Sequence, residues 1–146
     1  MQNFPHHYTA RAEGQSTGSV ATRAEGLETL EIAAPRQFDG PGDKWSPEDL
    51  LVACAADCLI LTFRAVANAS KLKWETLVCE VTGTLDMVDR VVQFTELQVH
   101  ATLTIDPQEN ADKARRVLEK AEKNCLITNS LTARTQLETN VSPSGN

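Results

Sequence analysis

The residues WSPEDLLVACAADCLILTF, at 45 to 63, constrain this chain more than any other segment. Ser46 is a good N-cap, because its side-chain oxygen can accept a hydrogen bond from an unpaired N–H of the first turn. Pro47 fits the first helical position, and the two acidic residues that follow favour a helix start through the backbone dipole. The segment is then apolar nearly all round, which is typical of a helix at the centre of a fold. We therefore expect a long central helix at about 46–70.

The rest of the chain combines strand patterns with one further helix. Short β-prone runs with glycine turns occupy about 7–33, and two longer strand patterns predict a hairpin at about 72–105. A charged amphipathic helix is predicted at about 108–125 and a last strand at about 133–141. This order favours an α+β fold with antiparallel sheets and two main helices. A chain of 146 residues suffices for one domain, so we expect a single domain over 1–146.

Charge and composition argue against several classes of partner and site. The net charge is −6 and no cluster of Lys or Arg is present, so we expect no nucleic acid partner. The longest apolar run, roughly 50–63, is shorter than the 20 or so residues of a membrane span, and we expect no membrane. No secretory signal pattern opens the sequence, so we expect a cytoplasmic protein with reduced cysteines. The cysteine and histidine spacings predict no metal site.

Two of the four cysteines are candidates for chemistry. Cys58 lies in the middle of the apolar helix, and Cys125 lies at the end of the polar one. A free cysteine often serves as a small buried hydrophobic group, and we interpret Cys54 and Cys79 in this way. Two thiols from two helices also suit a redox site, in which one thiolate attacks an O–O bond and becomes a sulfenic acid that the second thiol converts to a disulfide. From its position alone, Cys58 fits either interpretation.

The redox interpretation requires a low pKa for the attacking thiol, whose ordinary value is about 8.5. Cys58 is mid-helix, too far from the helix start for the backbone dipole to act on it. We therefore expect a nearby cation, for which the sequence offers Arg11, Arg23, Arg36 and Arg64. Asp57 would raise the pKa if it pointed at the sulfur, but consecutive helical side chains diverge by about 100 degrees.

Two motifs resemble those of a known family. SPEDLLVACAADC places Cys58 ten residues after Glu48, and AEKNCLITNSL places Cys125 sixty-seven residues later. Together they resemble the two cysteine motifs of the OsmC/Ohr family, the osmotically inducible and organic hydroperoxide resistance proteins. The preceding FDGPGD resembles the Gly-Pro-Gly loop of the family, and the strand order agrees along essentially the whole chain.

The resemblance implies a thiol-dependent peroxidase that reduces organic hydroperoxides to alcohols, and hydrogen peroxide less well. Cys58 would be the peroxidatic cysteine and Cys125 the resolving one, in an intertwined homodimer with two active sites at the interface. Glu48 would hold an arginine that binds the peroxidatic sulfur. Electrons would come from small dithiols or lipoylated proteins, without a metal or a bound organic cofactor.

The spacing of Glu48 and Cys58 independently favours a dimer. Ten helical residues span about 15 Å, too far for the carboxylate to act on its own cysteine even through one arginine. Two such helices packed antiparallel would bring Glu48 of one chain near Cys58 of the other. The plainer interpretation of Glu48 is an acid that the dipole favours at a helix start.

The chain departs from the family pattern in three places. Gln15-Ser16-Thr17 stands where the Ohr branch carries its arginine, so Arg36 in the loop before the helix is our candidate cation, beside the plainer interpretation of a solvated loop charge. Leu126 follows the second cysteine where the family usually has proline, and Asp57 stands where a small residue is usual. These changes keep three alternatives open: a catalytically weak or inactive OsmC-like binding protein, a redox sensor, or a structural dimer with core cysteines.

Overall fold

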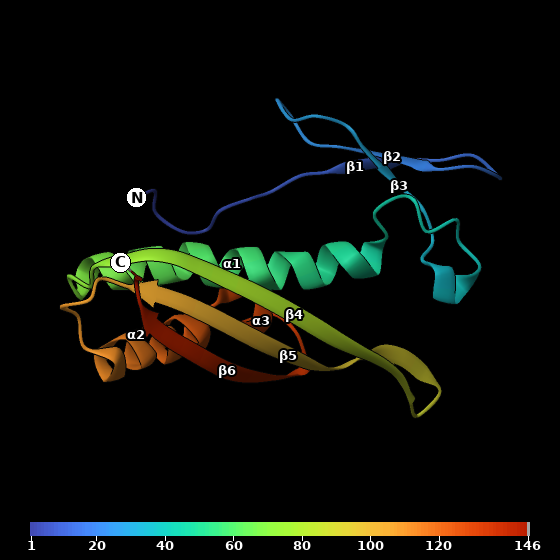
Figure 1. Cartoon of the computed structure of the whole chain (residues 1–146). Coiled ribbons are helices and arrows are strands. Elements are labelled where there is room, and N and C mark those ends of the chain that lie inside the picture. The colour runs from blue at the N-terminus through green and yellow to red at the C-terminus, as the bar shows by residue number, and fades with distance from the viewer. Residues whose placement is uncertain (146) are drawn as a thin grey trace. The chain divides into compact units, whose positions relative to one another are not determined.

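A computed structural model describes residues 1–145, which form two compact units, Met1–Leu50 and the residues from Leu51 onward. Figure 1 labels the elements of both units. The expectation of one domain over 1–146 stays a prediction, and its last residue, Asn146, lies outside the described residues.

The first unit contains a small antiparallel sheet in the order β1-β2-β3. Its elements are β1 (Arg11–Glu13), β2 (Val20–Arg23), β3 (Leu30–Ile32) and the short 3₁₀ helix η1 (Arg36–Phe38). Beyond β3 the backbone N–H of Ala33 donates to the carbonyl of Trp45 at 3.0 Å, and Ile32 forms a parallel bridge with Trp45. This contact fixes the residue that precedes the N-cap of the central helix to the sheet.

The second unit is built on a three-stranded sheet in the order β4-β5-β6. Its strands are β4 (Trp74–Val88), β5 (Val91–Ile105) and β6 (Arg134–Pro143). β4 and β5 form the predicted long hairpin, whose turn consists of Asp89 and Arg90 alone (Figure 1). Both residues have positive φ, 50° and 68°, which suits a two-residue hairpin turn because its twist matches that of the strands.

The last strand corrects one part of the expected topology. β6 pairs with β5 in parallel, from Glu96 opposite Arg134 to Ile105 opposite Pro143, so this sheet is mixed and not wholly antiparallel. The reason is the connection, which holds α2 (Ala111–Lys123) and α3 (Leu126–Asn129). Parallel neighbours need such a crossover of a dozen or more residues, whereas a tight turn can only reverse the chain. The α+β class with two main helices is confirmed.

Helix α2 begins three residues later than the sequence pattern suggested. Asn110 is its N-cap, and the Asn110 side chain accepts a hydrogen bond from the backbone N–H of Lys113 at 3.0 Å. Such a bond satisfies one of the free N–H groups of the first turn and so sets where the helix starts.

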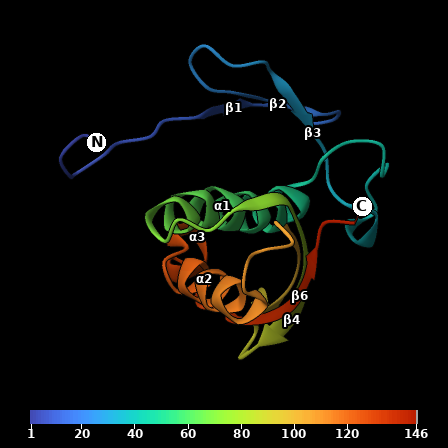
Figure 2. The same ribbon diagram turned by 60° about the vertical axis from the view of Figure 1, so that its left-hand side comes forward.

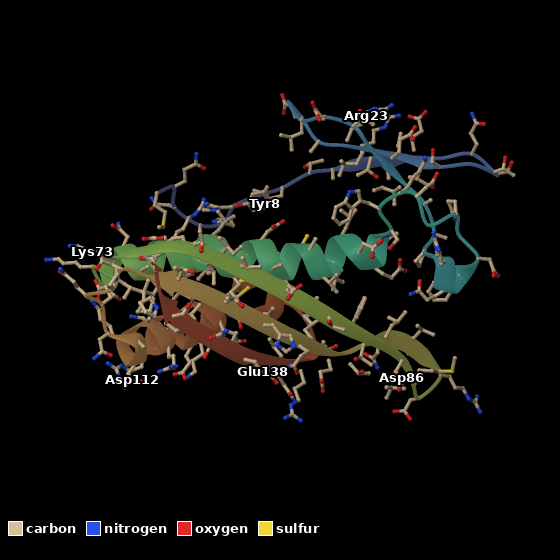
Figure 3. All side chains as sticks on the ribbon, in the orientation of Figure 1. Tyr8, Arg23, Lys73, Asp86, Asp112 and Glu138 are labelled. Carbon is tan, nitrogen blue, oxygen red and sulfur yellow. The ribbon has the colours of Figure 1, made fainter. Side chains whose placement is uncertain are left out.

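Charged side chains of this unit face outward, as Asp112 and Glu138 do in Figure 3. The carboxylate of Asp112 forms an ion pair with the guanidinium of Arg115 at 2.7 Å.

One face of the β4-β5-β6 sheet carries the core of the second unit. The helices α1 (Pro47–Ala69) and α2 lie side by side against that face (Figure 2). Alternate residues of β5 point into this layer, as the strand period of two requires. The core includes Phe63 and Ala67 from α1, Val99, Ala101, Leu103 and Ile105 from β5, and Ala114, Leu118 and Ala121 from α2.

The central helix α1 is more one-sided than its composition suggested. Ala55, Cys58, Leu59, Phe63 and Ala67 are buried along one face. Cys54 is exposed in the described chain, so its interpretation as a packed core residue is wrong.

Helix α1 is long and apolar enough to cross a membrane, whereas the apolar run at roughly 50–63 alone was judged too short to do so. This is weak evidence for a span, because the core helix of a water-soluble protein passes the same test.

We predict that Phe63→Ala lowers the free energy of unfolding by about 3–5 kcal/mol. Phe63 is fully buried, and its ring meets that of Trp74 edge to face at a centroid distance of 5.1 Å. Urea denaturation measures the change. The matched control is Asn68→Ala, an exposed position on the same helix, which should change stability by about 0.5 kcal/mol or less. Similar effects of the two substitutions would contradict this account of the core.

Candidate active site

The first thiol of the candidate site comes from the middle of α1. Cys58 belongs to the buried face of the helix, with 8% of its surface exposed. One turn later on the same face, the hydroxyl oxygen of Thr62 lies 3.8 Å from the Cys58 sulfur. Packing of α1 against the sheet therefore removes this thiol from solvent and leaves polar neighbours beside it.

The second thiol comes from the break between α2 and α3. Cys125 is the N-cap residue of α3, with an extended backbone conformation (φ −69°, ψ 105°), and is 2% exposed. Its own carbonyl accepts a hydrogen bond from the Thr128 hydroxyl at 3.2 Å. The break turns the chain by ending one helix and starting another, and this turn directs the Cys125 side chain inward.

The structure brings Cys58 and Cys125 together. The two thiols are near enough for each to shift the pKa of the other, although the two residues are far apart in the sequence. Both cysteines are free thiols. Two neighbouring thiols are suited to form a disulfide once one of them is oxidised.

Hydrogen bonds set the acidity of Cys58. Burial by itself raises the pKa of its thiol, but four hydrogen bonds outweigh burial and hold the pKa below its ordinary value. The donors are the backbone N–H of Ile127, the thiol of Cys125, the hydroxyl of Thr62 and the backbone N–H of Leu126. Each donor favours the thiolate because a negative sulfur accepts hydrogen bonds more strongly than a neutral one.

The expected cation near Cys58 stays a prediction. Within the described residues, every group that lowers the pKa of Cys58 is a hydrogen-bond donor and none is a charged side chain. Arg64, the candidate cation on α1 itself, is exposed. Within this one chain, hydrogen-bond donors account for the lowered pKa of Cys58.

Cys125 has the opposite acid–base character. Burial raises the pKa of its thiol, and the hydrogen bond to Cys58 and the negative charge of the Cys58 thiolate raise it further. Hydrogen bonds with Thr128 act in the other direction but are outweighed. Cys58 therefore ionises first, and Cys125 stays protonated as its donor.

Cys79 differs from this pair. Burial raises the pKa of its thiol to about 11, and its side chain packs against the core from β4. This agrees with the interpretation of Cys79 as a packing residue. Among residues 1–145 no group of three His, Cys, Asp or Glu side chains is placed to hold a metal ion.

Glu48 lies in the first unit, where it lines an apolar cavity of about 330 Å³. The cavity walls include Val20, Ile32 and Phe38. The Oε2 atom of Glu48 is buried there and has no hydrogen-bond partner within the described chain. A buried carboxylate oxygen without a partner is costly, so this atom needs a donor or cation from elsewhere.

The acid that caps α1 is Asp49, not Glu48. The Asp49 N–H donates to the Ser46 hydroxyl at 3.0 Å, and the Ser46 N–H donates to the Asp49 carboxylate at 3.1 Å. This reciprocal pair is a capping box, which satisfies two free N–H groups at once. The plainer interpretation of Glu48, as an acid at the helix start, therefore does not explain its buried oxygen.

Arg36 also lies in the first unit, in η1. Its side chain lies over Gly42, where a Cβ atom would come within 2.0 Å of the Arg36 Nε. It is exposed, it is absent from the lining of the Glu48 cavity, and no ion pair joins it to Glu48 in the described residues. Within this unit the structure does not pair the two residues.

Sequence reasoning missed three participants, namely Thr62 and the backbone N–H groups of Leu126 and Ile127. Thr62 was accessible to such reasoning, because positions i and i+4 share a helix face. The two amides carry no side-chain signal at all. Only the packing of α3 against α1 reveals them as donors to Cys58.

We predict that Cys58 reacts with iodoacetamide at lower pH than Cys79 and Cys125. A lowered pKa means that the reactive thiolate is already present at a pH where thiols of raised pKa remain protonated. The measurement follows alkylation of each cysteine peptide of the reduced protein by mass spectrometry, from about pH 5 to about pH 10. In urea all three should converge on the ordinary value of about 8.5. A Cys58 profile above that value would contradict the hydrogen-bond account.

Comparison with known proteins identifies the family. The family model described as OsmC-like protein matches residues 40–140. The uncharacterized protein YmaD of Bacillus subtilis (strain 168) is 26% identical over 137 residues, covering 91% of each chain. An organic hydroperoxide resistance protein, OsmC, from Legionella pneumophila is 27% identical, with 96% of this chain and 99% of that chain covered and a TM-score of 0.75.

A further solved structure resembles this fold at low sequence identity. An OsmC-like protein of unknown function from Vibrio cholerae is 14% identical with a TM-score of 0.86, covering 93% of this chain and 100% of that one. At this identity the likeness concerns the fold. The family model, in contrast, matches well over half of the chain and includes both cysteines. The chain therefore belongs to the OsmC-like family.

Proposed function

We propose that this protein is a cysteine peroxidase that reduces organic hydroperoxides, and hydrogen peroxide more weakly, in defence against oxidative stress. The observation that carries the proposal is the contact between two buried thiols of opposite acid–base character, Cys58 and Cys125. The organic hydroperoxide resistance proteins among the relatives, such as the one from Legionella pneumophila, support the choice of substrate.

In the first step the Cys58 thiolate attacks the terminal oxygen of the hydroperoxide. The O–O bond breaks, the sulfur becomes a sulfenic acid, and the other oxygen leaves as an alkoxide that takes up a proton to become the alcohol. The hydrogen bonds to the Cys58 sulfur favour this step because they stabilise the reactive thiolate.

In the second step the Cys125 sulfur attacks the Cys58 sulfenic acid, forming a disulfide and releasing water. The change at Cys58 prepares this step. Once Cys58 is a neutral sulfenic acid, the negative charge that raised the pKa of Cys125 is gone, so Cys125 loses its proton more readily. An external dithiol or a lipoylated protein then reduces the disulfide by thiol–disulfide exchange, and no step uses a metal or a bound cofactor.

We further propose that the active protein is a cytoplasmic homodimer in which each chain completes the site of the other. Glu48 has a buried oxygen without a partner, and helical geometry puts it about 15 Å along α1 from its own cysteine. Antiparallel pairing of α1 helices would place this carboxylate beside Cys58 of the partner chain. Arg36 is our candidate for the cation between them, and the apolar cavity that Glu48 lines is our candidate for the alkyl pocket.

A redox sensor or binding protein of the same fold is the second candidate function. The observation that favours it is the absence, in the described residues, of an ion pair between Glu48 and Arg36. A site with an acidic Cys58 but no organised cation would oxidise without rapid turnover. Disulfide formation followed by slow reduction would distinguish this sensor from a peroxidase.

We predict that one equivalent of cumene hydroperoxide converts the reduced protein to a Cys58–Cys125 disulfide, mapped by mass spectrometry. Cys58→Ser should abolish oxidation, whereas Cys125→Ser should stop at the Cys58 sulfenic acid because no second thiol can resolve it. Cys54→Ser is the matched control, since it removes an exposed thiol one turn away on the same helix. In the Cys54→Ser variant, the Cys58–Cys125 disulfide should form at the wild-type rate.

Two outcomes would decide against the peroxidase. If the thiols of the folded protein stay reduced, the structural dimer with core cysteines is correct. If the disulfide forms but neither dithiothreitol nor dihydrolipoamide sustains hydroperoxide consumption, the redox sensor is correct.

We predict that the protein sediments at twice the 16.0 kDa of one chain and that its sites are shared. Glu48→Gln and Cys58→Ser should each lower activity about tenfold or more when alone. When the two variants are mixed and allowed to exchange, each mixed dimer contains one intact site, so activity should return to about a quarter of the wild-type rate. Arg36→Ala should behave like Glu48→Gln. A monomer, or a mixture with no recovery, would contradict shared sites.

A further inference from the structure

The hydroxyl group of Thr62 contacts the sulfur of Cys58 directly. The Thr62 oxygen lies 3.8 Å from the sulfur, within hydrogen-bonding distance for a sulfur atom, and the two residues are four apart on α1. Positions i and i+4 share a helix face, so the helix itself holds the two side chains together. The contact therefore depends neither on α3 nor on a partner chain.

The Thr62 hydroxyl is directed at a side chain, which is uncommon for a hydroxyl inside a helix. Helical serine and threonine often bond the backbone carbonyl four residues back, as the Ser130 hydroxyl at the end of α3 does with the Leu126 carbonyl at 2.7 Å. Within the described residues the Thr62 hydroxyl instead bonds the sulfur four residues back. Thr62 is half-buried and the sulfur belongs to a buried residue, so water competes weakly for this bond.

The charge on Cys58 decides the direction of the bond. A neutral thiol can donate its S–H to the hydroxyl oxygen, whereas a thiolate has no proton and can only accept. A threonine hydroxyl serves both states because it is a donor and an acceptor and can rotate. A hydrogen bond to a charged acceptor is the stronger of the two, so the Thr62 hydroxyl favours the ionised sulfur.

On the basis of the proposed function, we propose that Thr62 is a catalytic residue whose hydroxyl stabilises the Cys58 thiolate in two steps of the cycle. In the first, the hydroxyl donates to the thiolate that attacks the hydroperoxide. In the second, a thiolate of the external dithiol attacks the Cys125 sulfur, the S–S bond breaks, and its electron pair leaves on Cys58 as a thiolate that again accepts from Thr62. A more stable thiolate is a better leaving group, so Thr62 favours entry of the reductant at Cys125.

The other titratable groups near Cys58 leave this effect measurable. Cys125, at the junction of α2 and α3, is the titratable group that acts on Cys58, and no charged side chain within residues 1–145 does so. On α1 itself Asp57 and Arg64 are exposed, and on β4 burial raises the pKa of Cys79 to about 11. A change in Cys58 ionisation after substitution at position 62 therefore reports the hydroxyl.

Thr62→Val tests the role, because valine keeps the branched shape and replaces the hydroxyl with a methyl group. The measurement is the pH dependence of Cys58 alkylation in the reduced protein without hydroperoxide. We expect Thr62→Val to lower the rate at neutral pH about threefold to tenfold and to move the profile to higher pH, as the loss of one hydrogen bond predicts. Thr62→Ser is the matched control, since it keeps the hydroxyl, and its rate should stay within about twofold of wild type.

The second step is tested on the Cys58–Cys125 disulfide prepared with diamide, so that no peroxidase activity is needed. Dithiothreitol should reduce this disulfide about twofold or more slowly in Thr62→Val than in wild type or Thr62→Ser, because the leaving thiolate is less stable. With glutathione as a single thiol, mass spectrometry should find the mixed disulfide on Cys125.

Thermal unfolding establishes that the variants are folded, and Thr62→Ala replaces Thr62→Val if the latter is not. Equal alkylation profiles in wild type and a folded variant without the hydroxyl would overturn the proposal, as would an equal shift in Thr62→Ser. A mixed disulfide on Cys58 would overturn the second step. Because neither measurement uses hydroperoxide, a Cys58 ionisation that depends on the hydroxyl supports the role of Thr62 even if the peroxidase fails its own test.

Discussion

The proximity of Cys58 and Cys125 depends on the packing of two helices against one sheet face. α1 carries Cys58 along its buried side, and the crossover that returns the chain to β6 carries Cys125 at the junction of α2 and α3. A parallel strand requires such a crossover, and here the crossover covers the sheet face on which α1 also lies. The topology of the sheet therefore places the second thiol beside the first.

Burial and reactivity oppose each other at Cys58. Removing a thiol from water disfavours its charged form, as Cys79 shows with a pKa raised to about 11 by burial alone. Cys58 is also buried, but it faces the free N–H groups at the start of a helix and two further donors. These donors are fixed by the fold, so they need no reorganisation when the sulfur becomes charged, and the site keeps an apolar environment without losing its thiolate.

In the first unit, two adjacent acidic residues have different roles. Asp49 closes a capping box with Ser46, which stabilises the start of α1. Glu48 contributes nothing to that cap and instead carries a buried, unpartnered oxygen into an apolar cavity. A protein seldom retains such an atom without a partner, because the desolvation cost is of the order of 1–3 kcal/mol or more. This cost is the physical reason to seek its partner in a second chain.

The sequence by itself determined the elements, the α+β class and the pair of cysteines, because N-caps, apolar periodicity and motif spacing are local properties. It also left signals for Thr62, four residues from Cys58, and for the unusual Leu126. Tertiary structure decided the parallel pairing of β6, the exposure of Cys54 and the source of Cys58 acidity. These depend on which surfaces meet, and a backbone N–H has no letter in the sequence: any residue except proline supplies one, and only packing aims it at a sulfur.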